Sequence, residues 1–184
     1  MAEQIHRQAA TVQRRDQASV SGFVLTEINT RFLWSIQADN RQDLVEFTQA
    51  IFAEKAQFGN MLTRDSLRLL QLWPSKAYLL YDHPALPDPL QEFSSMLTDI
   101  SHGMSELSLV SDQSLDFLNH HTSVNLQDPR IADSRSVRCL LGQYPVIIWW
   151  DQISDIRLLI DRSYAQSLRD YLNHLLQRWD QVSQ

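Results

Sequence analysis

Residues 144–150 read Tyr-Pro-Val-Ile-Ile-Trp-Trp, a run in which no side chain carries a charge. Its β-branched and aromatic residues predict a β-strand. Because both faces of that strand are apolar, it either lies buried on both sides or exposes one side to a partner. Pro145 cannot donate a hydrogen bond to a neighbouring strand, so it fits the start of a strand or a strand at a sheet edge. If the strand exposes one side, Trp149 and Trp150 would lie at a partner interface.

The segments on either side of this run predict two more strands and a terminal helix. The strands are expected at 137–141 and 156–161. Ser163 and Gln166 have the spacing of a capping box, which predicts a helix start. Apolar residues then recur at steps of three and four, as in a helix that packs by one face. This stripe consists of Tyr164, Leu168, Tyr171, Leu172, Leu175, Leu176 and Trp179.

Upstream, predicted strand pairs alternate with single helices. Alternating apolar residues indicate the strands, and residues that favour tight turns separate them. The expected pairs are 23–28 with 31–37, joined at Asn29 and Thr30, and 67–73 with 76–81, joined at Pro74 and Ser75.

Three helices are predicted between these strands, each from a residue that caps helix starts. The first begins at Asp39 and Asn40 and stops at Gly59, the second has Asp88 as N-cap, Pro89 as first residue and Leu97 facing inward, and the third is capped by Ser111 or Asp112.

The segment 104–110 predicts a strand with one face in solvent. Leu107 and Leu109 alternate with Glu106 and Ser108, so the polar pair is expected to face water. Further along, residues 124–134 are expected to form a loop.

Together these elements predict an α+β fold. We expect a mixed, largely antiparallel sheet, built from hairpins that alternate with single helices, with the helices on one face. The length of 184 residues suits one domain. Residues 18–184 are assigned to it, and the polar segment 1–17 to an N-terminal arm or weak helix.

The composition is that of a globular protein, with 43% hydrophobic and 21% charged residues. No apolar run approaches the ~18 residues of a membrane-spanning helix, and no secretion signal is evident, so we expect a soluble chain that does not bind membranes. The single cysteine, Cys139, excludes an internal disulfide and favours a cytoplasmic location. On a predicted strand, it is expected to be a small buried residue and not a reactive thiolate.

Charge argues against nucleic-acid binding. The formal net charge is -6, whereas phosphate binding needs clustered Lys and Arg. Residues 82–128 contain eight carboxylates and no Lys or Arg. This segment forms either a solvated acidic surface or a docking surface for a basic partner, in which Asp112 and Asp116 would take part.

Few residue groups suggest catalysis, and each has a structural interpretation. Asp99, Ser101 and His102 include the residue types of a nucleophilic triad, but neighbouring residues that enter a strand point to opposite faces. His120 and His121 are adjacent and cannot face one metal ion from a helix. The glycines do not form a phosphate-binding loop. No catalytic, cofactor-binding or metal-binding residue is therefore assigned.

The order of several segments resembles the gamma subunit family of heterotetrameric sarcosine oxidase, which is itself similar to the glycine-cleavage T-protein. The similarity covers residues 66–179. Residues 111–114 read Ser-Asp-Gln-Ser where that family has Gly-Pro-x-Ala, and Asn125 stands where Asp is usual. The resembling segments are 70–80 (LQLWPSKAYLL), 98–102 (TDISH), 123–126 (SVNL), 137–142 (VRCLLG), 144–149 (YPVIIW) and 156–165 (IRLLIDRSYA).

The resemblance implies a T-protein-like (folate-binding-domain-like) fold and a non-catalytic, structural role beside alpha, beta and delta subunits. In such a complex, FAD, FMN, NAD and tetrahydrofolate bind to other subunits, and sarcosine is oxidatively demethylated to glycine. T-proteins that bind folate carry an acidic residue on the strand that matches 144–150. This chain has none there, so we expect no cofactor on this chain itself.

Two other functions stay open from the sequence. One is a stand-alone folate-binding or aminomethyltransferase-like protein of the T-protein family. The other is an unrelated interaction module that self-associates through Trp149, Trp150 and the C-terminal helix.

Overall fold

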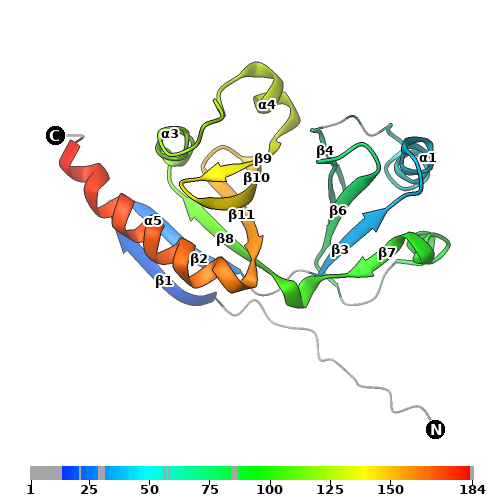
Figure 1. Ribbon diagram of the computed structural model, residues 1–184, viewed down its shortest axis with the longest axis horizontal. Coiled ribbons are helices and arrows are strands. Elements are labelled where there is room, and N and C mark those ends of the chain that lie inside the picture. Colours follow the sequence, from blue (N-terminus) through cyan, green and yellow to red (C-terminus); the bar gives the residue numbers. More distant parts are fainter. Residues whose placement is uncertain are drawn as a thin grey trace, which may run out of the picture.

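Two antiparallel sheets lie side by side in the computed structural model, with helices against their outer faces (Figure 1). None of the described helices combines the length and the apolar character that a membrane span requires. The structure describes residues 14–20, 22–28, 32–55, 57, 59–83 and 87–182.

The larger sheet, called sheet A, has six strands, and each strand runs antiparallel to its neighbours. In their order across the sheet, these are β1 (Arg14–Val20), β2 (Phe23–Ile28), β8 (Met104–Val110), β11 (Asp155–Asp161), β10 (Tyr144–Gln152) and β9 (Ser136–Leu141).

The smaller sheet, called sheet B, has five strands with the same antiparallel pairing. In order, they are β4 (Met61–Arg64), β5 (Leu67–Leu70), β6 (Lys76–Tyr81), β3 (Phe32–Gln37) and β7 (Leu97–Asp99).

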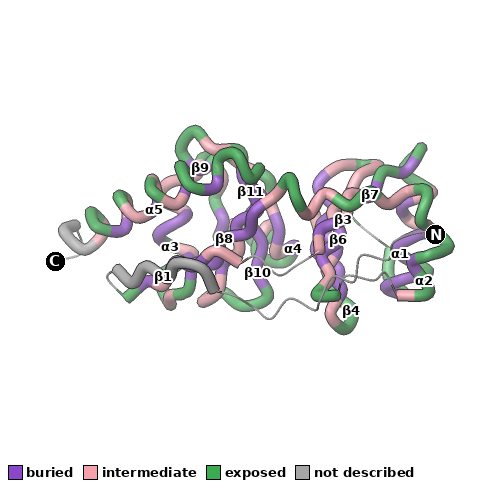
Figure 2. Tube along the Cα trace, turned by 90° about the horizontal axis from the view of Figure 1, so that it is seen from below, coloured by how far each residue is buried: buried purple, intermediate pink, exposed green. Residues whose placement is uncertain are grey.

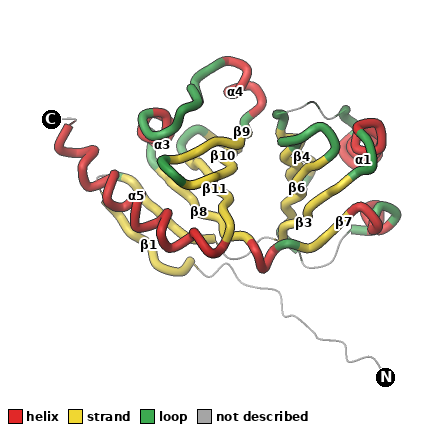
Figure 3. Tube along the Cα trace, viewed as in Figure 1, coloured by secondary structure: helices red, strands yellow, loops and turns green. Residues whose placement is uncertain are grey.

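Helices connect the strands, except for the last helix, which follows the final strand (Figure 3). They are α1 (Arg41–Phe52), α2 (Asp88–Gln91), α3 (Ser114–Asn119), α4 (Pro129–Ser134) and α5 (Arg162–Val182), with 3-10 turns η1 (Ser94–Met96) and η2 (Ser101–Gly103).

Strand β10 explains why the run at 144–150 is apolar on both faces. Val146, Ile148 and Trp150 join the core that lies under α3 and α5, on the outer face of sheet A. Ile147 and Trp149 join a second core, between the two sheets. The strand is therefore buried on both sides, and Figure 2 draws its central part as buried.

Each of the other cores follows from alternating apolar residues. On the outer face of sheet B, Ile36 and Leu79 contact Phe47 of α1. On its inner face, Leu33 and Leu80 meet sheet A. Burying one such side chain contributes about 1.5–3 kcal/mol, so these three layers supply most of the driving force for folding.

Two of the predicted helices are confirmed, with different ends. Asn40 caps α1 as expected, because its side chain accepts from the backbone N–H groups of Gln42 and Asp43. The helix ends at Phe52, well before Gly59, because Ala53 adopts a left-handed conformation with φ of 58°. The terminal helix α5 begins at Arg162, so the capping box predicted at Ser163 and Gln166 is wrong. Gln166 instead donates to Asp170, one turn further along the helix.

Other element boundaries also differ. Strand β5 ends at Leu70 and pairs with β4, which the sequence pattern missed. Pro87, not Asp88, occupies the N-cap position of α2, and Leu97 lies in β7. Helix α3 begins at Ser114, two residues after the later of its predicted caps. The loop predicted at 124–134 contains α4, which Asp128 caps through the N–H of Arg130.

The predicted hairpin between 23–28 and 31–37 is wrong. Strand β2 pairs with β1 and β8 in sheet A, whereas β3 pairs with β6 and β7 in sheet B. Its predicted turn at Asn29 and Thr30 lies outside the described residues. The sequence predicted one sheet, whereas the structure has two, and helices cover the outer face of each sheet. Residues 14–17, predicted as part of the arm, lie in β1, and 1–13 fall outside the described residues.

The solvent-facing side predicted for β8 is also wrong. Glu106 and Ser108 are only 4% and 5% exposed. They lie on the inner face of sheet A, where Arg157 places a guanidinium nitrogen 3.8 Å from a Glu106 carboxylate oxygen. Ser108 donates to Asp155 at 2.8 Å, and Arg157 contacts the other oxygen of Asp155. A buried charge needs such partners, and alternation alone does not reveal them.

Candidate functional site

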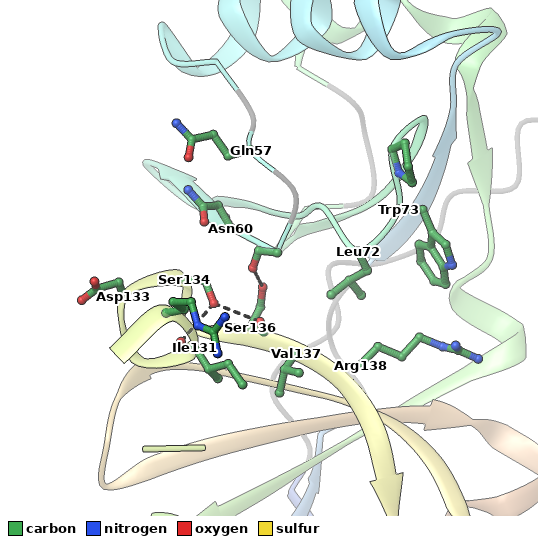
Figure 4. Close-up of a pocket in the computed structure, with 13 residues that line it drawn as sticks. Gln57, Asn60, Leu72, Trp73, Ile131, Asp133, Ser134, Ser136, Val137 and Arg138 are labelled. Atoms are coloured by element: carbon green, nitrogen blue, oxygen red, sulfur yellow. Dashed lines mark hydrogen bonds between the residues drawn. The ribbon is translucent and has the colours of Figure 1, made fainter. Parts of the chain in front are cut away.

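One functional candidate is a cleft of about 1030 Å³ between the two sheets (Figure 4). One wall consists of the segment that leads into β4 and of the turn between β5 and β6. The other wall consists of α4 and the first half of β9. The lining residues are Gln57, Gly59, Asn60, Leu72, Trp73, Pro74, Arg130, Ile131, Asp133, Ser134, Ser136, Val137 and Arg138.

Hydrogen bonds hold the two walls together at the base of the cleft. The Ser136 hydroxyl donates to the Gly59 carbonyl at 2.7 Å, which joins two segments 77 residues apart. The Ser134 hydroxyl donates to the carbonyls of Ile131 and Ser136 at 3.0 and 3.2 Å. These buried hydroxyls fix α4 against β9, so the cleft is preformed.

An ion pair at the start of α4 neutralises one of the cations in the cleft wall. Arg130 donates to both oxygens of Asp128, at 3.0 and 2.8 Å. These hydrogen bonds lower the pKa of Asp128 to about 2 and raise the pKa of Arg130.

Trp73 and Arg138 lie at the opposite end of the cleft from Asp133 (Figure 4), and they belong to a group of aromatic and cationic side chains. The Arg138 guanidinium lies 5.6 Å from the centroid of the Trp73 ring, and the Lys76 ammonium lies 5.3 Å from the same centroid. Tyr78 contacts Trp73 edge-on, at 5.6 Å between centroids, and lies 5.6 Å from the Lys76 ammonium. We call these four residues the cation–aromatic cluster.

The environment of Tyr78 in this cluster raises the pKa of its phenol. Burial of the phenol raises its pKa first, and the negative charge of Asp161 raises it further, while the positive charge of Arg138 lowers it. Tyr78 is therefore neutral at physiological pH and cannot neutralise either cation of the cluster.

Of the residues that resemble a nucleophilic triad in type, Ser101 and Asp99 have a structural role. Ser101 lies in the turn η2, and its hydroxyl donates to Asp99 at 2.5 Å. The same hydroxyl accepts from the backbone N–H of Leu33 at 2.9 Å. Ser101 thus closes the end of β3, and its oxygen is occupied by the backbone it supports.

Histidine side chains at the end of α3 pack against aromatic rings. The His121 ring lies 4.9 Å from that of Phe117, and the His120 ring lies 5.1 Å from that of Trp179. Burial, followed by the neighbouring His120, lowers the pKa of His121. Within the described residues, no group of three or more His, Cys, Asp or Glu side chains is arranged to hold a metal ion.

Cys139 lies half-buried in β9, as the sequence predicted for a small packed residue. Burial raises the pKa of its thiol to about 11. A reactive thiolate requires a lowered pKa, so this environment favours the inert thiol.

The structure separates the four residues predicted at a partner interface. Asp112, in the turn before α3, and Asp116, within α3, are exposed, although Asp116 accepts from Gln127 at 2.6 Å. Trp149 and Trp150 are 1% and 3% exposed, so they do not form a surface for a partner. Of the two alternatives for their strand, burial on both sides is the correct one. An interface role for the two aspartates stays a prediction.

The sequence did not predict the cleft. Its walls join residues that lie far apart in the chain, which short patterns do not detect. The available signal was the segment Trp73-Pro74-Ser75-Lys76, where a turn places an aromatic residue beside a cation.

Comparison with known proteins shows similarity in structure. No protein-family model matches the sequence, and no curated protein matches it significantly. A chain of the heterotetrameric sarcosine oxidase from Corynebacterium sp. U-96, solved in complex with pyrrole 2-carboxylate, superposes with a TM-score of 0.70 at 20% identity, covering 86% of this chain and 86% of that one. Glycine cleavage system aminomethyltransferase T from Bartonella henselae superposes with a TM-score of 0.56 at 13% identity, covering 79% of this chain and 44% of that one.

These likenesses establish the fold. It is the α+β fold of the T-protein and of a chain in heterotetrameric sarcosine oxidase, as the resemblance of the sequence segments predicted.

Proposed function

We propose that this chain is the small, non-catalytic gamma-type subunit of an oxidase complex of the heterotetrameric sarcosine oxidase type. The observation that carries the proposal is the likeness to a chain of such an enzyme, which covers 86% of both chains. Equal coverage means that the two chains have about the same length. Most of this chain therefore corresponds to most of one chain of that assembly.

The state of the candidate catalytic residues supports a structural role. The Ser101 hydroxyl is used by the backbone of β3, and burial keeps the Cys139 thiol protonated. The proposal assigns FAD, FMN, NAD and tetrahydrofolate to the alpha, beta and delta subunits. The assembled complex would oxidise sarcosine to glycine, with tetrahydrofolate as the one-carbon acceptor.

Co-expression with the larger subunits tests the proposed assembly. The full chain, carrying an affinity tag, should co-purify with them and co-elute in size exclusion as one complex that turns over sarcosine. Elution as a lone 21.4 kDa species at every salt concentration would contradict the proposal.

The non-catalytic role needs a separate measurement in the assembled complex. Ser101→Ala and His102→Gln should each leave kcat for sarcosine within about twofold of the parent, since loss of a catalytic acid–base group costs on the order of 100-fold or more. A loss of that size, with the complex intact, would show that this chain contributes to the chemistry.

A stand-alone T-protein-like function is the second candidate, favoured by the structural likeness to aminomethyltransferase T. Against it, Asp151, the first acidic residue of β10, pairs with Arg68 of β5 at 2.7 Å. Titration calorimetry of the isolated chain with tetrahydrofolate distinguishes the two. Binding of tetrahydrofolate with a micromolar Kd would support the second candidate. The absence of any heat of binding at millimolar tetrahydrofolate would exclude it.

A further inference from the structure

We propose that the cleft between the sheets is the docking site for an acidic segment of a partner subunit, with Arg138 and Lys76 as the groups that bind its carboxylates. This inference rests on the proposed function, because it requires a partner chain. It assigns to the cleft a role separate from the acidic surface at Asp112 and Asp116.

The first observation is that these two cations have no carboxylate partner. Within the described part of the chain, Arg68, Arg130 and Arg157 form ion pairs, whereas Lys76 and Arg138 form none and lie over aromatic rings. Neither of these two cations therefore has an ion-pair partner, and Asp161 acts on the cluster only through its charge near Tyr78. A local field of this sign attracts negative groups against the overall repulsion of the protein.

The second observation is that the cluster holds its cations in place. Arg138 and Lys76 both lie over the Trp73 ring, so their side chains are positioned before any ligand arrives. An arginine stacked on a ring keeps the N–H groups at its edge, which suit a carboxylate in a bidentate geometry. Arg138 is also exposed, so this edge can be reached from solvent.

The third observation is the shape of the cleft, which favours a chain segment over a small ion. A volume of about 1030 Å³ lies at the upper end of the range for small-molecule sites. Leu72, Pro74 and Val137 provide apolar lining of the cleft. Figure 4 shows Leu72 and Val137 between Arg138 and α4. Carboxylates of a segment would meet the cations while its neighbouring side chains cover this lining.

Affinity measurements on the assembled system test the proposal. The double variant Arg138→Gln with Lys76→Gln should bind the remaining subunits about tenfold more weakly at 50 mM NaCl, and the difference should shrink at 300 mM because salt screens exposed charges. The double variant Arg41→Gln with Arg178→Gln, an equal charge change at exposed positions of α1 and α5, serves as the matched control and should bind like the parent.

Carbodiimide cross-linking gives a direct readout, because it joins amines to carboxylates that touch. The chain has only two lysines, Lys55 and Lys76. In the complex, mass spectrometry should find Lys76 linked to an Asp or Glu of a partner subunit. Lys76→Arg should keep the affinity and lose this link, since it retains the charge without the amine.

The outcomes separate the two proposals. If the parent chain binds no subunit, the proposed function fails and the docking site falls with it. If the complex forms but the double variant binds equally well and Lys76 yields no link, only the docking site is overturned. A link to a second copy of this chain would assign the cleft to self-association. Saturable binding of inorganic phosphate that the double variant loses would assign it to a small anion. Either result would overturn the docking proposal.

Discussion

Replacement of Gly142 by alanine should destabilise the fold through one identifiable contact. Gly142 lies in the turn between β9 and β10, with φ of +59°. A Cβ atom there would lie 2.6 Å from the Tyr171 hydroxyl oxygen and 2.8 Å from its ring carbon Cζ. Tyr171 lies on α5 and packs against Tyr144, at 5.6 Å between ring centroids. The new methyl group must therefore displace a side chain that fixes α5 to sheet A.

The expected cost is about 2 kcal/mol. Left-handed backbone costs an alanine about 1–2 kcal/mol more than a glycine. Displacing Tyr171 forfeits part of an aromatic contact of about 0.5–1.5 kcal/mol. Alanine also lowers the entropy of the unfolded chain, which offsets about 0.4–1 kcal/mol of this loss of stability. For a domain of this size, the net change should lower Tm by about 4–8 °C.

Urea unfolding of the purified full chain, followed by far-UV circular dichroism, measures this cost. Gly103→Ala is the matched control, because it has open space around the added Cβ and no positive φ, while its unfolded state changes in the same way. In a Tyr171→Leu background, the penalty of Gly142→Ala should fall to about 1 kcal/mol, the backbone part alone. Equal stability of the Gly142 and Gly103 variants would refute this reasoning.

Three further predictions follow from burial and charge. Leu158→Ala, in the core under α5, should cost about 2–5 kcal/mol in urea unfolding, and a loss below 1 kcal/mol would contradict the assigned packing. Cys139, with a pKa of about 11, should stay unmodified by a disulfide reagent at pH 8 until the chain unfolds, and stoichiometric labelling of the native chain within minutes would contradict this. Asp128 should titrate near pH 2 by NMR, so that its stabilising effect is complete above pH ~4 and is lost as the pH falls through 2. Arg130→Gln should return this pKa toward the ordinary value, and an unchanged titration would exclude Arg130 as the cause.

Local patterns identified most strands because side-chain alternation depends on neighbouring residues alone. Strands β9, β10 and β11 lie within a few residues of the predicted ranges, since each has a dense set of apolar positions. Alternation does not show which strands pair with each other. The pattern of 23–28 and 31–37 suits a hairpin, but tertiary packing places β2 and β3 in different sheets.

The burial of polar side chains could not be predicted from the alternation of apolar and polar residues either. Glu106 alternates with leucines as a solvent-exposed residue would, yet Arg157, 51 positions away, makes its burial tolerable. The same limit applies to the cleft, where Ser136 and Gly59 meet although 77 residues separate them in the chain. The start of α4 was predictable, because Asp128 and Pro129 form a capping signal that was assigned to a loop.

Burial of Trp149 and Trp150 limits where a partner can bind. The outer face of sheet A lies under α3 and α5, the outer face of sheet B lies under α1, and the inner faces meet each other. Among the described residues, partner contacts are therefore expected from loops and strand edges. Two such regions have opposite charge. One, called the acidic turn, is the turn into α3 together with the first half of α3, which carry Asp112 and Asp116, and the other is the cation–aromatic cluster.

Charge reversal separates these two regions. Asp112→Lys with Asp116→Lys should weaken the complex at low salt, and the effect should shrink as salt rises, if the acidic turn meets a basic partner. Glu54→Lys, an exposed change beyond the end of α1, is the control. If the turn and the cleft are independent contacts, adding Arg138→Gln should change the binding free energy additively, within about 0.5 kcal/mol. Unchanged affinity after reversal would discard the acidic turn as a docking surface and leave the cleft as the candidate.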